Sequence, residues 1–300
     1  MIVPDLEELL ALRGAAHGLS LHGWKAARAM MLGAHSSAQR GRGLEFQEVR
    51  SYVAGDDPRN IDWRVTARRG RPHTKLFREE RERPVWLLVD LQPGLFFGTR
   101  RQLKSALAVR AAALLAWVAS LGGDRVGAVI TDGTAQCRIL PPRARQTGVL
   151  PLLDALAEAQ PKGPGQPAPL AMESALRALL PLARPGNLIL ALSDFAGLRE
   201  QAGSLWTALA AHSDLRLFWI TDALEEDGLP NGRFRAGLPG RLRLLEGGRV
   251  RERWRQAWRE REAQVAALSQ RSAAPVVRLD TRQPVAEVLR PLLRPRRWAA

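Results

Sequence analysis

The chain has 300 residues, a formal net charge of +15 and a hydrophobic fraction of 46%. That apolar fraction is ordinary for a globular protein, and the length allows one large domain, or one domain with a smaller module. Because Cys137 is the single cysteine, an internal disulfide and a cysteine-based zinc site are excluded, which is typical of proteins from a reducing compartment.

The first segment of the chain predicts a helix and not a targeting signal. In residues 3–12, leucines recur at helical spacing on one face. Acidic residues come early in this segment, and it has neither the basic stretch nor the apolar core of a signal peptide. We therefore expect a cytoplasmic protein.

Residues 40–80 form the most distinctive part of the chain, because charged residues of both signs alternate there with aromatic ones. The sequence Gly-Asp-Asp-Pro at residues 55–58 is a strong turn signal. Residues 73–77 alternate polar and apolar side chains and predict a strand.

From residue 84 onward, short apolar runs alternate with helical patterns. Nearly continuous apolar runs predict parallel strands buried on both faces at residues 85–90, 126–131, 187–193 and 215–221. Shorter strands are predicted at residues 136–140, where Pro141 ends the strand, 241–245 and 275–279. Helices are predicted at residues 100–121, 144–159, 170–182, 198–211, 251–270 and 284–293, and a loop at residues 228–240.

This alternation predicts an α/β fold with a doubly wound, mostly parallel, Rossmann-like sheet and a small N-terminal lobe. We expect the lobe and the N-terminal segment at residues 1–83 and the α/β domain at residues 84–295. The most apolar segment, residues 106–121, is interrupted by Arg110 and predicts a buried helix, so no membrane span is expected.

Three of the buried strands have a carboxylate at their carboxyl end. The first strand ends in Asp90, and two later strands are directly followed by Asp194 and Asp222. Ligands of such folds bind outside the carboxyl ends of the strands, and Mg²⁺ prefers oxygen ligands. An aspartate in this position also commonly caps the turn or helix that follows. Both a metal site and a capping role stay open from the spacing.

The ordered motifs of residues 41–80, followed by Val-Trp-Leu-Leu-Val-Asp at residues 85–90, closely resemble the DUF58 family, whose members carry a von Willebrand factor A-like (vWA-like) domain. The rest of the chain follows the order of strands and helices in that domain. The resemblance therefore implies the vWA version of the α/β fold. It also implies that the family signature includes Glu45, Arg50, Tyr52, Asp56, Asp57, Arg59, Asp62, Trp63 and Arg68.

The vWA resemblance also implies a Mg²⁺ site, of which this sequence keeps only part. Such domains use an aspartate and two serines after the first strand, a threonine from a later loop and a second aspartate. Asp90 and Asp194 match the two carboxylates, whereas Gln92 and Gly94 replace the serines, and residues 163–170 contain no threonine. We expect at most a weak, degenerate site of Asp90, Gln92 and Asp194, and a protein that needs no cofactor.

The mixed charges of residues 40–80 predict a network of ion pairs, because arginine holds carboxylates in bidentate pairs and stacks on aromatic rings. This network either sets the shape of the lobe or presents a docking surface, and the sequence leaves both open. Residues 249–261 hold six arginines around Trp254 and Trp258, which share one face of a helix. That pattern favours a helix whose tryptophans pack on the sheet. It is less typical of a helix that binds nucleic acid or a partner.

No phosphate-binding loop, nucleophile elbow or metal-binding histidine pair occurs in the sequence, which favours a non-enzymatic adaptor. The DUF58 resemblance implies a MoxR-type AAA+ ATPase as its partner. One alternative is a metal-dependent hydrolase or nuclease that uses Asp90 and Asp194 with Asp56 and Asp57. The other is a basic nucleic-acid-binding protein, against which the dispersed positions of the basic residues argue.

Overall fold

The structure is a computed structural model of the chain. It describes residues 3–21, 44–53, 56, 58–79, 83–134, 136–166, 168–196, 198–237, 240 and 242–294. The chain divides into two compact units, an α/β unit formed by Met1–Leu32 with Arg83–Ala300, and a lobe formed by Gly33–Glu82. Each unit is described by itself below.

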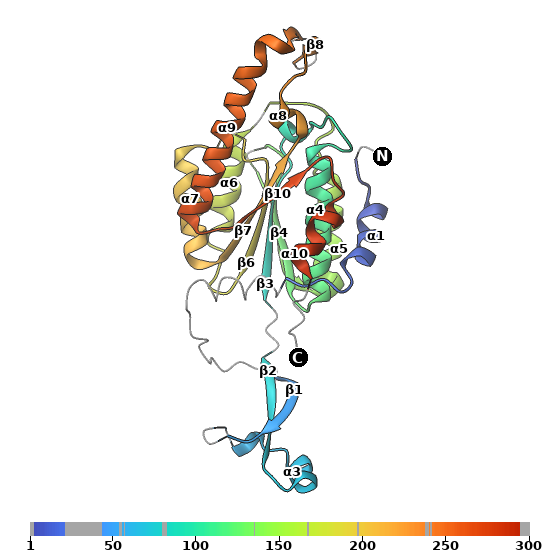
Figure 1. Cartoon of the computed structure of the whole chain (residues 1–300), viewed down its shortest axis with the longest axis vertical. Helices are drawn as coiled ribbons and strands as arrows, with labels where there is room; N and C mark the ends of the chain where they lie inside the picture. Colours follow the sequence, from blue (N-terminus) through green and yellow to red (C-terminus); the bar gives the residue numbers. More distant parts are fainter. Residues whose placement is uncertain are drawn as a thin grey trace. The chain divides into compact units, whose positions relative to one another are not determined.

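A six-stranded sheet forms the centre of the α/β unit (Figure 1). Its strands lie in the order β10-β7-β6-β3-β4-β5, and every adjacent pair is parallel except β4 with β5. The strands are β3 (Pro84–Asp90), β4 (Arg125–Thr131), β5 (Arg138–Ala144), β6 (Leu188–Ser193), β7 (Asp214–Thr221) and β10 (Val276–Asp280). The predicted doubly wound, mostly parallel α/β sheet is thereby confirmed, and it is consistent with a vWA/Rossmann-like fold.

Helices cover both faces of this sheet (Figure 1). One face packs against α1 (Leu6–Ala16), α4 (Lys104–Leu121), α5 (Arg145–Glu158) and α10 (Val285–Leu293), and the other against α6 (Pro169–Leu179), α7 (Glu200–His212) and α9 (Gly247–Ser272). Successive residues of β3 alternate between the two hydrophobic layers, with Leu87 in the first and Trp86 and Leu88 in the second. Burial on both faces is why the strands are almost continuously apolar.

Helix α4 is long and apolar enough to cross a membrane by composition, but 83% of it is buried inside the protein. That burial is typical of a core helix and agrees with the expectation for residues 106–121. Arg110, which interrupts the apolar run, is half-buried and pairs with Glu8 of α1 (Nε to Oε1, 2.5 Å).

The N-terminal helix α1 belongs to the α/β unit, which differs from the expected grouping of residues 1–83 with the lobe. Leu9 and Ala16 are fully buried, and Trp117 of α4 donates its indole N–H to the carbonyl oxygen of Leu9 at 3.0 Å. Helical spacing reveals an apolar face but not the surface that the face covers. The lobe is therefore an insertion between α1 and β3.

Edge strand β5 continues through Pro141 and Pro142, whereas the sequence predicted that it ends before them. Proline lacks a backbone N–H and is tolerated on an edge strand, where one side of the ladder has no partner. Gly127 of β4 permits the close approach, since a Cβ at this position would lie 2.6 Å from the carbonyl oxygen of Leu140.

Small elements cluster at the carboxyl end of the sheet. Helix α8 (Ala223–Asp227) follows β7, and a hairpin of β8 (Arg233–Ala236) and β9 (Arg243–Glu246) leads into α9. The expected loop at residues 228–240 therefore contains a strand. The hairpin and the start of α9 extend beyond the sheet (Figure 1).

The lobe is built on the antiparallel pair β1 (Leu44–Ser51) and β2 (His73–Glu79). The short helices η1 (Pro58–Asn60) and α3 (Trp63–Arg69) lie between these strands in the chain. The sequence predicted β2 but not β1 or α3. A strand opposite β2 was missed because the alternation of apolar and polar residues in β1 shifts by one residue at residues 47–48, where its pairing with β2 has an irregularity.

Candidate functional site

The strand order reverses between β3 and β6, and α/β folds usually bind ligands outside the carboxyl ends of such strands. The three residues that the sequence suggested as metal ligands all lie at this switch point. Asp90 is the last residue of β3, Gln92 follows it, and Asp194 directly follows β6. The three side chains belong to one hydrogen-bonded and electrostatic network.

The carboxyl group of Asp90 is buried and accepts three hydrogen bonds. Its Oδ2 accepts from Ser193 Oγ at 2.6 Å and from Gln92 Nε2 at 2.9 Å, and its Oδ1 accepts from the backbone N–H of Gln92 at 3.2 Å. Burial and the neighbouring charge of Asp194 raise the pKa of Asp90 to about 6, although the hydrogen bonds favour the ionised form. The ionised form of Asp90 is therefore less favoured than that of an exposed aspartate, although it still predominates at neutral pH.

Asp194 is bound by a buried lysine. Lys104 Nζ donates to Asp194 Oδ2 at 2.7 Å and to Glu225 Oε1 at 2.9 Å, and the side chains of Lys104 and Asp194 are each 3% exposed. Burial acts to lower the pKa of Lys104 and to raise the pKa of Asp194. Their mutual attraction and hydrogen bond, together with the contributions of neighbours such as Glu225, outweigh burial, so the pKa of Lys104 is raised and that of Asp194 is lowered. The ammonium group supplies the positive charge that a metal ion would supply between these carboxylates.

Tight loops close over this network. Pro93 lies between Gly133 and Gly165. A Cβ at Gly133 would lie 2.6 Å from Pro93 Cδ, and a Cβ at Gly165 would lie 2.4 Å from Pro93 Cβ. The amide oxygen of Gln92 accepts the backbone N–H of Ala168, which ties the loop before α6 to the same point. As a result, Asp90 is 1% exposed and Gln92 is 2% exposed.

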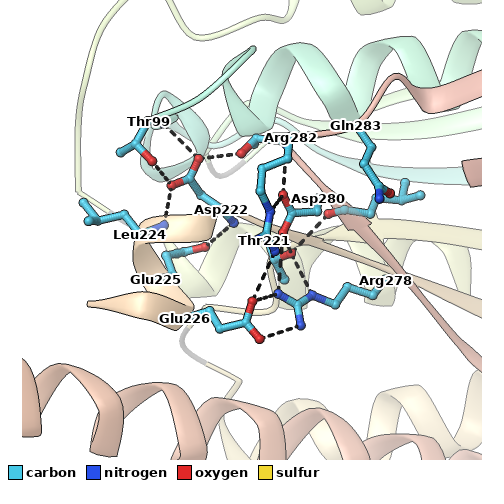
Figure 2. A network of polar contacts seen from close by, with 12 residues as sticks. Thr99, Thr221, Asp222, Leu224, Glu225, Glu226, Arg278, Asp280, Arg282 and Gln283 are labelled. Carbon is cyan, nitrogen blue, oxygen red and sulfur yellow. Dashed lines mark hydrogen bonds and ion pairs between the residues drawn. The ribbon is translucent and has the colours of Figure 1, made fainter. Parts of the chain in front are cut away.

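The third strand-end carboxylate, Asp222, caps helix α8 (Figure 2). It accepts the hydroxyl groups of Thr99 and Thr281, each at 2.5 Å, and the backbone N–H groups of Thr99 and Leu224, each at 2.9 Å. Its own N–H donates to Glu225, which completes a capping box. Burial acts to raise the pKa of Asp222, but these hydrogen bonds bring it below its usual value. Asp222 therefore fixes loops at the sheet edge.

In the lobe, the acidic side chain of Asp56 stabilises a turn. Its Oδ1 pairs with Arg50 at 2.7 Å, and its Oδ2 accepts the backbone N–H of Val53 at 3.0 Å. The Tyr52 hydroxyl donates to the carbonyl oxygen of Asp56 at 3.1 Å. The hydrogen bond from Val53 is the main cause that lowers the pKa of Asp56; desolvation opposes it, and Arg50 adds to it.

Helix α3 has an inner and an outer side. Asp62 caps its first turn by accepting two backbone N–H groups at 3.0 and 3.1 Å, and Thr66 on the inner side accepts the N–H of His73 at 3.0 Å. The outer side presents Trp63, which is 70% exposed, and the exposed Arg68. The described acids of the lobe are thus architectural, whereas Trp63 and Arg68 are accessible to a partner.

Three further signature residues need separate mention. Arg59 lies exposed in η1. Glu45 lies in β1 opposite Arg78 of β2, but its side chain is outside the described residues, as is all of Asp57.

A family model described as "Protein of unknown function DUF58" matches residues 48–265 of the chain. The chain belongs to the DUF58 family. The resemblance identified from the motifs of residues 41–80 is thereby confirmed at the level of the family, and the match extends from β1 into α9.

Similar proteins of this DUF58 chain include "Uncharacterized protein Rv1480" of Mycobacterium tuberculosis and "Uncharacterized protein Mb1516" of Mycobacterium bovis. Each is 38% identical over 165 residues, which are 55% of this chain and 51% of the relative. The chain therefore spans about half the length of the curated relatives it matches.

Two solved structures are partly similar to this chain in their backbone fold. An aerotolerance-related membrane protein from Bacteroides fragilis has a TM-score of 0.45 at 12% identity, over 69% of this chain and 97% of that one. The conserved hypothetical protein BatB from Bacteroides thetaiotaomicron has a TM-score of 0.42 at 13% identity, over 70% and 98%. Likeness at this level says nothing about the function of this DUF58 chain.

The residues at the switch point of this DUF58 chain do not fit the expected Mg²⁺ site. Asp194 is bound by Lys104, and Gln92 points its amide nitrogen at Asp90 and its oxygen at Ala168. Mg²⁺ requires several oxygen ligands in a nearly octahedral arrangement. Among the described residues, no group of three or more His, Cys, Asp or Glu could hold a metal ion. Asp56, which the hydrolase alternative adds to the site, uses both carboxylate oxygens inside the lobe.

Sequence reasoning missed Lys104 and Glu225 in this DUF58 chain. Lys104 is one of four lysines and stands at the first position of α4, where the helix dipole disfavours a cation. A lysine in this unfavourable position indicates that a contact elsewhere in the fold stabilises it, so the sequence did contain a hint of the role of Lys104. Glu225 carried none, because α8 has only five residues and no pattern of its own.

Proposed function

We propose that this DUF58 chain is a non-enzymatic adaptor that acts in the cytoplasm and binds a partner protein through the outer side of α3. The observation that carries the proposal is Trp63, which is 70% exposed on a capped helix and is followed by the exposed Arg68. Tryptophan and arginine are enriched among the few residues that dominate binding energy at protein interfaces.

The DUF58 resemblance suggests the partner, a MoxR-type AAA+ ATPase. The charge of α3 supports an acidic complementary surface on that partner, because Arg64, Arg68 and Arg69 are all exposed on this helix. Complementary charge of this kind mainly increases the association rate and the specificity of a complex.

The buried carboxylates of the α/β unit support a binding role over a catalytic one. Hydrolysis by a bound metal needs an open coordination site that water or substrate can reach. Asp90 and Asp194 are no more than 2% exposed, and Asp222 is fully buried in its capping contacts. Each of these groups is stabilised by neighbours from the same chain.

The test is binding of the full chain to a purified MoxR-type ATPase from the same organism, measured by calorimetry with ATP, with ADP and without nucleotide. Trp63→Ala and Arg68→Glu should each weaken the complex about tenfold or more. Both side chains are exposed, so the thermal midpoint should stay unchanged. Arg177→Glu, at an exposed arginine of α6, makes the same charge change elsewhere and should have no effect on binding.

Two outcomes would count against the proposal. If the wild type forms no complex in any nucleotide state at micromolar concentrations, the ATPase is not the partner. If Trp63→Ala lowers the thermal midpoint together with the affinity, the outer side of α3 is architectural.

A further inference from the structure

A groove lies on the α/β unit between α8, β9 and the first half of α9. Its volume is about 380 Å³, within the range of ligand pockets, which is about 300–1,000 Å³. Apolar side chains form most of its lining, among them Leu245, Val250, Trp254 and Trp258. The start of α9, which forms one side of the groove, extends past the end of the sheet (Figure 1).

The two tryptophans of α9 have different roles. Trp258 packs on the sheet, where its ring stacks on Trp219 with centroids 5.0 Å apart. Trp254, one turn earlier, is half-buried and lines the groove. The expected packing of the tryptophan face on the sheet therefore applies to Trp258 alone, and Trp254 leaves an apolar surface for another molecule.

The groove lining also carries positive charge, at Arg253 and Arg261. Arg253 lines the groove, is exposed and makes no ion pair with any residue that the structure describes. Arg255, two positions further along α9, is exposed as well but lies on another side of the helix and does not line the groove. The acid in the lining, Glu225, already binds Lys104 and Arg261 (3.2 Å to Arg261). The free charge at the groove is therefore cationic.

Aliphatic side chains, those of Leu245 and Val250, form part of the groove lining. Leu242 and Leu244 are exposed as well, but they alternate with Leu245 along the chain and therefore face away from the groove. Aliphatic side chains bind apolar side chains of a peptide but give little stacking surface to nucleic-acid bases, which bind mainly on aromatic rings. The guanidinium group of arginine pairs with carboxylates through two parallel hydrogen bonds.

We propose that this groove binds an acidic peptide segment of a partner protein. An aromatic or large aliphatic side chain of the segment fills the space beside Trp254 and Trp258, and neighbouring carboxylates pair with Arg253. This second surface deepens the proposed adaptor role, because the lobe and the groove would bind different molecules. The test below contains no ATPase, so either proposal can fail while the other stands.

A library of random peptides displayed on phage would be selected on the immobilised full chain, and in parallel on its Arg253→Glu and Trp254→Ala variants. We expect the wild type to enrich peptides with Asp or Glu beside Trp, Phe or Leu. Fluorescein-labelled copies of these peptides then give Kd values by fluorescence anisotropy. Each variant should raise Kd about tenfold or more.

Arg259→Glu is the matched control, because it makes the same charge change in α9 at a residue that pairs with Glu252 (2.9 Å) outside the groove lining. It should change Kd by less than about twofold. Circular dichroism and urea midpoints check folding, and if Trp254→Ala does not fold, the exposed Arg253→Glu decides. The inference is overturned if no peptide is enriched, or if peptides bind all variants equally. It is also overturned if single-stranded DNA or phosphatidylserine vesicles displace the peptides and depend on the same two residues.

Discussion

Lys104 balances the charge of two carboxylates at the centre of the α/β unit. Its ammonium group lies 2.7 Å from Asp194 Oδ2 and 2.9 Å from Glu225 Oε1. A buried ion pair contributes little net stability, because the desolvation of both partners offsets their attraction. Loss of one partner is costly, however, because the other charge stays buried without compensation.

Lys104→Met should therefore lower the free energy of unfolding by about 3–5 kcal/mol in urea denaturation. The double variant Lys104→Met/Asp194→Asn should be less destabilised than the sum of the two single variants, since it leaves no unpaired charge at Asp194. Strictly additive losses would show that the two groups do not interact as described. Addition of MgCl₂ or EDTA should leave the thermal midpoint of the wild type unchanged, because Lys104 already binds Asp194.

Asp90 makes stability depend on pH. Its pKa of about 6 in the folded chain lies above the ordinary value of 3.8, so the folded state binds this proton more tightly than the unfolded state. The resulting stabilisation is complete below the ordinary pKa and is lost as the pH rises through about 6. Asp90→Asn cannot titrate. Between about pH 4 and pH 7, the free energy of unfolding of the wild type should fall by up to about 3 kcal/mol relative to that of this variant.

Urea unfolding of both proteins over this pH range provides the measurement. Other titrating groups are common to both proteins, so the difference between the two curves reports Asp90. Parallel curves would contradict a raised pKa at this position.

Between elements, two loops at the carboxyl end of the sheet meet at Pro93 without space for a further methyl group at the point of contact. Gly133 and Gly165 contact opposite parts of Pro93, just after β3. Gly133 also lies next to Gln92, which is 2% exposed, so the loops pack closely beside this part of the network.

Gly165→Ala should destabilise the chain by about 1–3 kcal/mol, because the new Cβ would lie 2.4 Å from Pro93 Cβ and one of the two loops must move. Gly163→Ala, two residues earlier, meets no atom within 4 Å and is the matched control. Urea unfolding of both variants measures the difference. Equal stability of the two variants would mean that the loops yield without cost.

Elements buried on both faces were the most predictable from the sequence. Strands β3, β4, β6 and β7 were placed within one or two residues, since each needs a nearly continuous apolar run. Helices α3 and α8 were missed because they have only seven and five residues, too few for a clear pattern. Strand β1 was missed because its alternation of apolar and polar residues is interrupted where its pairing with β2 shifts register.

At the scale of the whole molecule, the lobe is an insertion in a chain whose hydrophobic clusters, as far as the structure describes them, come from the α/β unit. A chain in which a flexible Gly/Ser linker replaces residues 33–82 should therefore keep a cooperative unfolding transition, followed by circular dichroism. It should also lose binding of the ATPase and keep binding of the acidic peptide. A chain that aggregates or unfolds without cooperativity would show that the lobe is required for folding.

The sequence by itself determined the family, the α/β class and the meeting of Asp90, Gln92 and Asp194 at one edge of the sheet. Local patterns suffice for this, because apolar periodicity identifies strands and parallel strands align their carboxyl ends. Only the tertiary structure decided what these residues do. Lys104 is 90 residues from Asp194 in the chain, and no local pattern reports which buried charges will meet. Charge pairing and loop closure are set by packing, and they place an internal ion pair where the sequence left at most a weak, degenerate metal site.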